Sequence, residues 1–223
     1  MINLTYQFKL KLSKKQIREI DHILAVNCQV YNFALTERKH WILSRKSPIN
    51  ACSIVSEYII PAETPYPNYY IQAKNLTIAK KTNPDLKSVN AQVLQQTLKT
   101  VDRAFSDMKS KGNGFPRYKK KMRSFVFPAM LNNCLAKGKI KLPQLGWLNI
   151  RQSRDYPTGF EVKQARIVKK ASGYYVLLAF QSKEQCPDIP VGKTSLGIDA
   201  GIESFVATSN GELIKAPKFL LKS

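Results

Sequence analysis

Apolar and polar residues alternate strictly near the N-terminus. Every even position from Leu4 to Leu12 is apolar and every odd position between them is polar. Because successive side chains of a β-strand point to opposite faces, this period predicts a half-buried strand with one basic face. Ser13 and Gln16 then have the spacing of a capping box, which begins a helix. The alternation therefore predicts a strand that leads directly into a helix.

Two long stretches carry the helical period. Apolar residues recur every three or four positions from Ile17 to Leu35 and again from Leu94 to Met108. Each stretch predicts an amphipathic helix, and we expect the two helices to pack against each other. Either Ser88 or Asn90 can cap the second helix, and Gly112 and Gly114 are expected to end it.

Shorter elements are expected between and after these helices. Ile54–Ile60 and Leu76–Lys81 read as short helices, the second one ended by Asn83 and the proline that follows it. Val162–Val168 and Tyr174–Phe180 read as a hairpin whose second arm is apolar on both faces and hence central in a sheet. Gly138–Ile150 reads as strand, turn, strand. With the N-terminal strand, these strand segments predict a small barrel or sheet interrupted by a helical insertion.

One carboxylate stands out near the C-terminal end of the sequence. Asp199 lies in an apolar run between two glycines, and a second apolar run, Phe205–Thr208, ends at the hairpin signal Asn210-Gly211. On one interpretation Asp199 lies on a central strand, where a charge is costly unless it serves chemistry. On the other, it caps a turn at a strand end. The local pattern does not separate these two interpretations.

The net charge of the chain limits the classes of molecule that it is expected to bind. The 223 residues include 36 Lys and Arg against 15 Asp and Glu, which gives a formal net charge of +21. A field of this sign attracts polyanions, so nucleic acid and anionic membranes are the candidates. No apolar run reaches the length of a membrane span or a signal-peptide core, so we expect nucleic acid as the partner and no membrane. The four dispersed cysteines and two histidines form no zinc-binding motif, so we expect no zinc site. The cysteines fit free thiols, so we expect the protein to lie in the reducing cytoplasm.

Cations and aromatic residues are interleaved between positions 109 and 127. Cations bind phosphates and rings stack on bases, so this mixture is typical of a nucleic-acid groove. A solvated loop anchored by its aromatic side chains would have the same composition, and the net charge of the whole chain favours binding. The candidate binding residues are Phe115, Arg117, Tyr118, Lys119, Lys120, Lys121 and Arg123.

Six motifs resemble, in the same order, those of the TnpB (OrfB) proteins of bacterial insertion sequences. The resemblance implies a compact RNA-guided DNA endonuclease, related to type V CRISPR effectors. Its partners would be a guide RNA and a double-stranded DNA target, and it would act in the bacterial cytoplasm at the nucleoid. The motifs are Gln95-Gln96, Asp102–Phe105, Gly114–Lys119, Ser124–Phe127, Lys141–Gly146 and Gly197–Ile202.

The resemblance also implies a domain plan of α+β class. Residues 1–12 and 124–182 would form a wedge-type β-barrel, interrupted by a helical recognition domain over residues 13–123. Residues 183–193 would be a linker. Residues 194–223 would be the first strands of a RuvC nuclease domain of ribonuclease H type. We therefore expect the chain to represent the front part of such a protein, with a C-terminal nuclease half as a missing partner.

The resemblance assigns two further residues. Asp199 matches the first metal-binding, catalytic aspartate of the nuclease site, and Gln95 lies where the family places a residue near the target-adjacent duplex. A two-metal site needs several carboxylates around its Mg²⁺ ions. After Asp199 the only acids are Glu203, expected to be solvent-exposed, and Glu212. We therefore expect Mg²⁺ to bind only in a completed site, and the isolated chain not to cleave DNA.

Three alternatives remain open at this point. The chain can be a non-catalytic DNA- or RNA-binding protein that acts by occupancy, as a repressor does. A Gly-Ile-Asp-x-Gly strand followed by a hairpin also begins the actin-like and chaperone-type ATPases, although there it lies near the start of a domain. Finally, an unpaired strand edge at Leu196 can leave the chain without a stable fold.

Overall fold

The computed structural model describes residues 2–46, 60–130, 133–182, 195–201 and 204–215. The chain divides into two compact units, Met1–Glu184 and Gln185–Ser223, which are described separately.

The first unit opens with the predicted strand and helix. Strand β1 covers Ile2–Lys11 and helix α1 covers Lys14–Lys46. The even-numbered side chains of β1 are the more buried ones, as the alternation predicts. The amide of Ser13 donates to Gln16 Oε1 at 3.0 Å and the amide of Gln16 donates to Ser13 Oγ at 3.3 Å. These reciprocal bonds confirm the capping box that begins α1.

Two shorter helices follow α1 in the described chain. Helix α2 covers Tyr69–Thr82, so the prediction of a short helix over Leu76–Lys81 found only its last part. Asn68 caps α2 by accepting a hydrogen bond from the amide of Ile71 at 3.1 Å, a start that the apolar spacing did not reveal. Helix α3, Pro84–Ser88, was missed, because the Asn-Pro pair before it begins a helix as well as ending one. The helix predicted over Ile54–Ile60 lies almost wholly outside the described residues.

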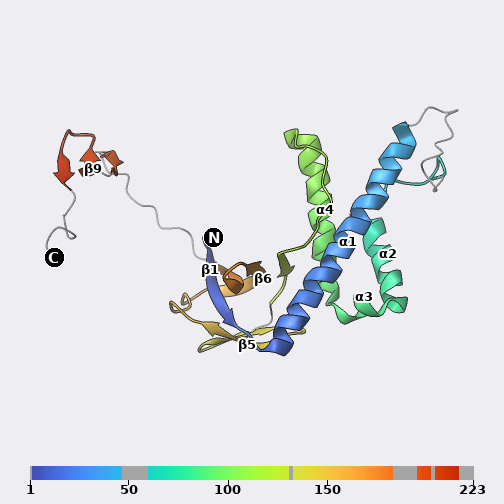
Figure 1. Ribbon diagram of the computed structural model, residues 1–223, viewed down its shortest axis with the longest axis horizontal. Helices are drawn as coiled ribbons and strands as arrows, with labels where there is room; N and C mark the ends of the chain where they lie inside the picture. Colours follow the sequence, from blue (N-terminus) through green and yellow to red (C-terminus); the bar gives the residue numbers. More distant parts are fainter. Residues whose placement is uncertain (1, 47–59, 131–132, 183–194, 202–203, 216–223) are drawn as a thin grey trace. The chain divides into compact units, whose positions relative to one another are not determined.

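Helix α4, Ala91–Lys111, is the second long helix that the sequence predicts. Asn90 caps it by accepting from the amide of Gln92 at 2.9 Å, and Gly112 ends it with a left-handed φ of 66°. Helices α1 and α4 lie side by side (Figure 1). Thr97 of α4 donates a buried hydrogen bond to Asn27 of α1, which confirms that the two helices pack together. No described helix is long and apolar enough to cross a membrane.

The remaining strands of the first unit form one antiparallel sheet with β1. Its order is β2-β6-β7-β1-β5-β4-β3, so β7 has a neighbour on each side, as its apolar sequence predicts. Strands β6 and β7 make the expected hairpin. The strands are β2 (Ser124–Phe127), β3 (Leu135–Ala136), β4 (Lys139–Leu142), β5 (Gly146–Arg151), β6 (Glu161–Lys170) and β7 (Gly173–Ser182).

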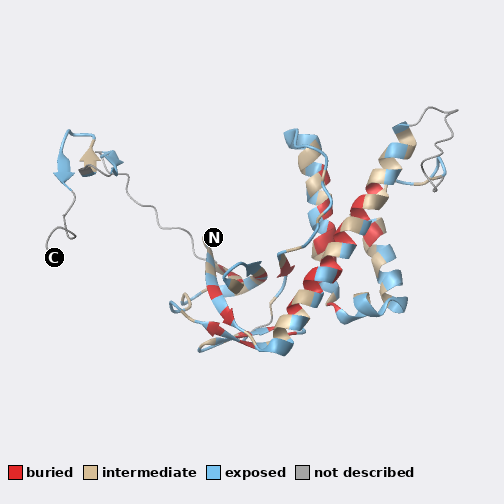
Figure 2. Ribbon diagram, viewed as in Figure 1, coloured by how far each residue is buried: buried red, intermediate tan, exposed pale blue. Residues whose placement is uncertain are grey.

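The expectation of a closed barrel is wrong. The described strands form an open sheet, with the short strands β2 and β3 at its two edges. Helices α1 and α4 contact β2. The buried hydrophobic residues of the helices and of the sheet form one continuous core. Figure 2 marks buried residues in red on both the helices and the strands of this unit. Because the helices cover apolar residues of the sheet, those residues are buried without closure of the sheet on itself.

The second unit contains three described strands in the order β10-β9-β8. They are β8 (Ile198–Asp199), β9 (Ser204–Thr208) and β10 (Leu213–Lys215). The hairpin predicted at Asn210-Gly211 is present, with the amide of Gly211 donating to the carbonyl of Thr208 at 3.0 Å.

Asp199 occupies a different position in this sheet from the one expected on the first interpretation. It pairs with Ala207 on an edge strand rather than a central one, and its side chain is exposed. The neighbouring Ile198 is also 66% exposed. The physical reason is that no described layer of this small unit covers the faces of the sheet.

Candidate nucleic-acid interface

The chain between α4 and β2, here called the basic segment (residues 112–123), is held along α1 by one asparagine. The amide of Lys119 donates to Asn32 Oδ1 at 2.9 Å, and Asn32 Nδ2 donates to the carbonyl of Lys119 at 2.9 Å. Cys28 Sγ, one turn earlier on α1, donates to the same carbonyl at 3.1 Å. Three hydrogen bonds therefore fix the backbone of the basic segment at Lys119.

Tyr118 extends this contact along the same face of α1. Thr36 Oγ1, one turn beyond Asn32, donates to the hydroxyl of Tyr118 at 3.2 Å. The ammonium of Lys39 lies 5.4 Å from the centre of the Tyr118 ring, within the range of a cation–π contact. The residue is still 48% exposed. Tyr118 therefore anchors part of its side chain and leaves the rest accessible to solvent.

The cations of the basic segment fall into two groups. Arg117, Lys120, Lys121 and Arg123 are exposed. Lys119 is half-buried, and its ammonium lies 4.1 Å from the centre of the Tyr31 ring. Burial lowers the pKa of Lys119 because desolvation disfavours the charged ammonium. The structure thus places one of the five predicted cations against the protein and four in solvent.

Both ends of the basic segment are attached to regular elements. Phe115 meets Phe105 of α4 edge to face at 5.5 Å between ring centres, and 43% of Phe115 remains exposed. At the other end, the amide of Lys169 on β6 donates to the carbonyl of Arg123 at 2.7 Å. The side chain of Lys169 in turn binds both carboxylate oxygens of Asp21 on α1, at 2.7 and 2.9 Å. These contacts therefore connect α1, the basic segment and strand β6 of the sheet.

Farther along α1, a buried arginine joins three helices. Arg38 is 1% exposed and donates to Asp102 Oδ1 of α4 at 3.0 Å and to Gln72 Oε1 of α2 at 3.1 Å. Gln72 also donates to Glu37 Oε2 at 2.9 Å. This network was not predicted from the sequence. The available signal was that Arg38 follows Leu35 by three residues and so continues the apolar stripe of α1.

Cation–aromatic pairs also occur outside residues 109–127. The guanidinium of Arg45 lies 4.9 Å from the centre of the Trp41 ring on α1. The ammonium of Lys99, on α4, lies 5.6 Å from the ring of Tyr69. Gln95, the residue expected near a target duplex, is half-buried on α4. The helical part of the unit thus carries positive charge held against rings, in addition to the basic segment.

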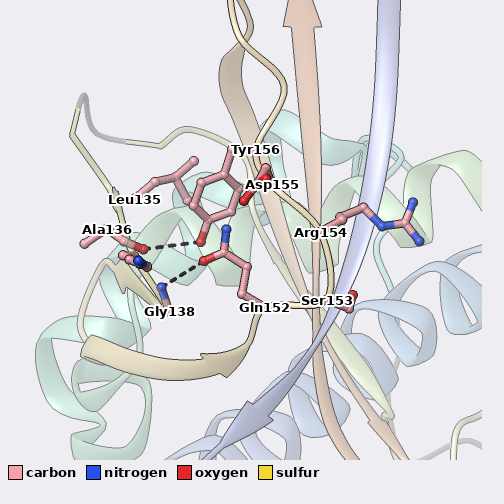
Figure 3. A pocket seen from close by; sticks show the side chains of 9 residues that line it. Leu135, Ala136, Gly138, Gln152, Ser153, Arg154, Asp155 and Tyr156 are labelled. Atoms are coloured by element: carbon pink, nitrogen blue, oxygen red, sulfur yellow. Dashed lines mark hydrogen bonds between the residues drawn. The ribbon is translucent and has the colours of Figure 1, made fainter.

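A hollow of about 830 Å³ lies between the β3–β4 turn and the loop after β5. Residues 135–138 and 152–156 line it. Figure 3 shows Gln152 and Tyr156 reaching to the backbone of the turn, with hydrogen bonds of 2.9 and 3.4 Å, while Arg154 extends away from them. The hollow is a depression lined by both polar and apolar residues, and these bonds connect its two sides.

The acidic side chains described near Asp199 decide whether the second unit could hold a pair of Mg²⁺ ions. A pair of Mg²⁺ ions requires several carboxylates at one place. No group of three or more His, Cys, Asp or Glu side chains that could hold a metal ion occurs within the described residues. Glu203 lies outside them. The described part of the second unit thus does not fit a complete two-metal site, and we assign no metal-dependent step to it.

Comparison with known proteins identifies a family model that matches the N-terminal part of the chain. Residues 1–47 match a family model described as a helix-turn-helix domain of the OrfB proteins of IS605-type elements. Within residues 2–46 the structure has one strand and one uninterrupted helix, rather than two helices joined by a turn.

Two relatives carry informative names. One is "Putative RNA-guided DNA endonuclease InsQ" of Escherichia coli (strain K12), 31% identical over 132 residues, which are 58% of this chain and 32% of that protein. The other is "Putative RNA-guided DNA endonuclease" of Streptomyces pristinaespiralis, 30% identical over 155 residues, which are 67% of this chain and 38% of that protein. The chain thus spans about a third of the length of the curated relatives it matches. On the family model and these two relatives, the chain belongs to the TnpB (OrfB) family.

Proposed function

We propose that this chain binds nucleic acid through the basic segment. One observation carries the proposal: Asn32 fixes the backbone of the segment on α1 while Arg117, Lys120, Lys121 and Arg123 remain in solvent. Cations presented from a fixed backbone meet phosphates with less loss of conformational freedom than cations on an unattached loop. A net charge of +21 attracts a polyanion to the whole chain.

Exposed rings give the segment a second type of contact. Phe115 and Tyr118 are 43% and 48% exposed while other parts of their side chains contact the helices. An exposed ring on an anchored side chain is a stacking surface for unpaired bases, whatever their sequence. The segment therefore suits a nucleic acid that presents phosphates and some unstacked bases.

The family supports a more specific form of this proposal. Both relatives described above carry the name "Putative RNA-guided DNA endonuclease". We propose that this chain holds a guide RNA and a double-stranded DNA target, with its first unit acting as wedge and recognition parts and its second unit beginning a RuvC-like nuclease domain. In a completed site of that kind, Asp199 would be a carboxylate ligand of Mg²⁺, which supplies the nuclease chemistry of the family.

Salt-dependent binding tests the core of the proposal. The purified chain is titrated against a fluorescein-labelled DNA duplex of about 30 base pairs, and against a single-stranded RNA of similar length, over a range of salt concentrations. For the duplex, each phosphate contact contributes about 0.9 to the slope of log affinity against log salt. Replacing both Lys120 and Lys121 by Ala is therefore expected to reduce the slope by about 1.8.

A matched control separates a local contact from general charge. Lys74→Ala with Lys81→Ala removes the same two charges from exposed positions of α2. This control is expected to change the slope much less. Equal changes in the two double variants would refute the basic segment as the binding site. No binding of either nucleic acid by the unaltered chain would refute the proposed function.

Cleavage is scored in the same samples with Mg²⁺ present. Cleavage of DNA that is lost in Asp199→Ala would show that the chain carries the nuclease chemistry. Salt-dependent binding without cleavage would favour action by occupancy, in which the chain holds nucleic acid without cutting it.

A further inference from the structure

We infer that Asn32 is a positioning residue for nucleic-acid binding, and that Lys119 is an inward anchor of the basic segment rather than a phosphate contact. The inference rests on the function proposed above. It adds which residue arranges the binding surface, and it separates Lys119 from Lys120 and Lys121, which the sequence presents as one run of equivalent cations.

The first step is the geometry of the Asn32 side chain. Its carboxamide accepts from the amide of Lys119 and donates to the carbonyl of the same residue, both at 2.9 Å. A single planar group thus satisfies both backbone polar groups of one residue, as a neighbouring strand would do in a sheet. Among the side chains that could replace Asn32, neither Ala nor Asp can make this pair, because Ala has no polar atoms and ionised Asp only accepts hydrogen bonds.

The second step is the direction of the lysine side chains. The ammonium of Lys119 lies over the ring of Tyr31, which is only 4% exposed. Lys120 and Lys121 are exposed. A cation packed on a buried ring is already desolvated and held, so it is poorly placed to release a counterion or to reach a phosphate. The anchoring of Lys119 leaves its two neighbours as the cations available to a ligand.

The third step links the anchor to affinity. Without the Asn32 bonds, a partner must order the backbone and the long side chains of the basic segment during binding, at an entropic cost. The charges themselves stay in place. Loss of Asn32 should therefore weaken binding at every salt concentration by a similar factor, whereas loss of a true phosphate contact should change the salt slope.

The experiment uses the full chain and the labelled duplex described above. We expect Asn32→Ala to weaken binding about tenfold or more with an unchanged salt slope. We expect Lys119→Met, which keeps an apolar stem on Tyr31, to leave the slope unchanged, and Lys120→Met to reduce it by about 0.9. Asn149→Ala, at an exposed position of β5, is the matched control and should bind as the unaltered chain does.

A second measurement follows the anchor without any nucleic acid. Because Cys28 Sγ donates to the carbonyl of Lys119, release of the segment exposes this thiol. Its alkylation rate, measured on the Cys28 peptide by mass spectrometry, should rise in Asn32→Ala and stay unchanged in Asn149→Ala. Circular dichroism verifies that each variant is folded, so that a rise reports local release.

Each outcome has a defined meaning. Unchanged affinity in a folded Asn32→Ala variant, while the unaltered chain binds, would overturn the positioning role and leave the proposed function intact. If Asn32→Ala does not fold, Lys119→Met decides: a slope reduced as much as in Lys120→Met would overturn the anchor. Failure of the unaltered chain to bind would overturn the proposed function and, with it, this inference.

Discussion

The sharpest stability prediction concerns Asp102, the carboxylate that faces the buried guanidinium of Arg38. The two side chains are 3.0 Å apart, with Arg38 1% and Asp102 49% exposed. Replacing Asp102 by Ala leaves a buried cation with Gln72 as its remaining hydrogen-bond acceptor among the contacts described here. Because desolvation of Arg38 is already complete in the folded protein, the lost attraction appears as a loss of folding free energy.

The expected size follows from the exposure of the pair. Two unit charges in contact near a protein surface attract by about 4 kcal/mol. The half-exposed carboxylate is partly screened by solvent, so we discount this value by about half and expect a cost of about 2 kcal/mol. For a unit of this size, Met1–Glu184, that corresponds to a lowering of the melting temperature by about 4 to 8 °C.

Asp107 on the same helix is the matched control. It forms an ion pair with Lys111 at 2.7 Å, shorter than the Arg38 pair, but the two side chains are 30% and 67% exposed. We expect Asp107→Ala to cost less than about 0.5 kcal/mol, because exposed pairs contribute little and a carboxylate near the C-terminal end of a helix is unfavourable. The gain in helix propensity from Asp to Ala is similar at both positions and cancels in the comparison.

The assay is urea unfolding of the full chain, followed by far-ultraviolet circular dichroism, for the two variants and for Arg38→Met with and without Asp102→Ala. The double variant measures the coupling between the two charges directly. If Asp107→Ala costs as much as Asp102→Ala, burial does not decide the strength of these pairs and the reasoning is wrong.

Three further predictions concern local features of the first unit. Gly112→Ala should destabilise α4 by about 1 kcal/mol because φ there is 66°, whereas Gly114→Ala, with open space and no left-handed φ, should be near neutral in thermal unfolding. Ser13→Ala should cost about 1 kcal/mol in urea unfolding through loss of the capping box. The hydrogen bond to Asp21 raises the pKa of Lys169. The stability that this contact adds to the fold should therefore be complete below the ordinary lysine pKa of 10.5 and be lost as pH rises through the raised pKa. Asp21→Asn should flatten this alkaline decline in stability.

Much of the first unit was predictable because its signals are local. The alternation in β1, the capping box at Ser13 and the left-handed stop at Gly112 each depend on a few neighbouring residues. Backbone conformation at such positions is determined mainly by short-range sterics and hydrogen bonds. The pattern of residues therefore predicted the order and kind of most elements.

The basic segment was predictable in composition and unpredictable in arrangement. The sequence marked its cations and rings as candidates for binding nucleic acid, and that role stays a prediction. It did not distinguish Lys119 from Lys120, because the distinction depends on Asn32, 87 residues away in the chain. The position of Arg38 on the apolar stripe of α1 was visible in the sequence, but its partners Gln72 and Asp102 come from two other helices and depend on how those helices pack.

The sequence by itself determined the local elements, the positive charge and the family resemblance of this protein. Only the tertiary structure decided that the sheet is open, that Asp199 lies exposed on an edge strand, and which cations face inward. The physical reason is the distance along the sequence over which each feature is determined. Helices, turns and caps are set by neighbours within a few residues. Burial and strand pairing depend on contacts between distant residues, such as Asp21 and Lys169, which are 148 positions apart.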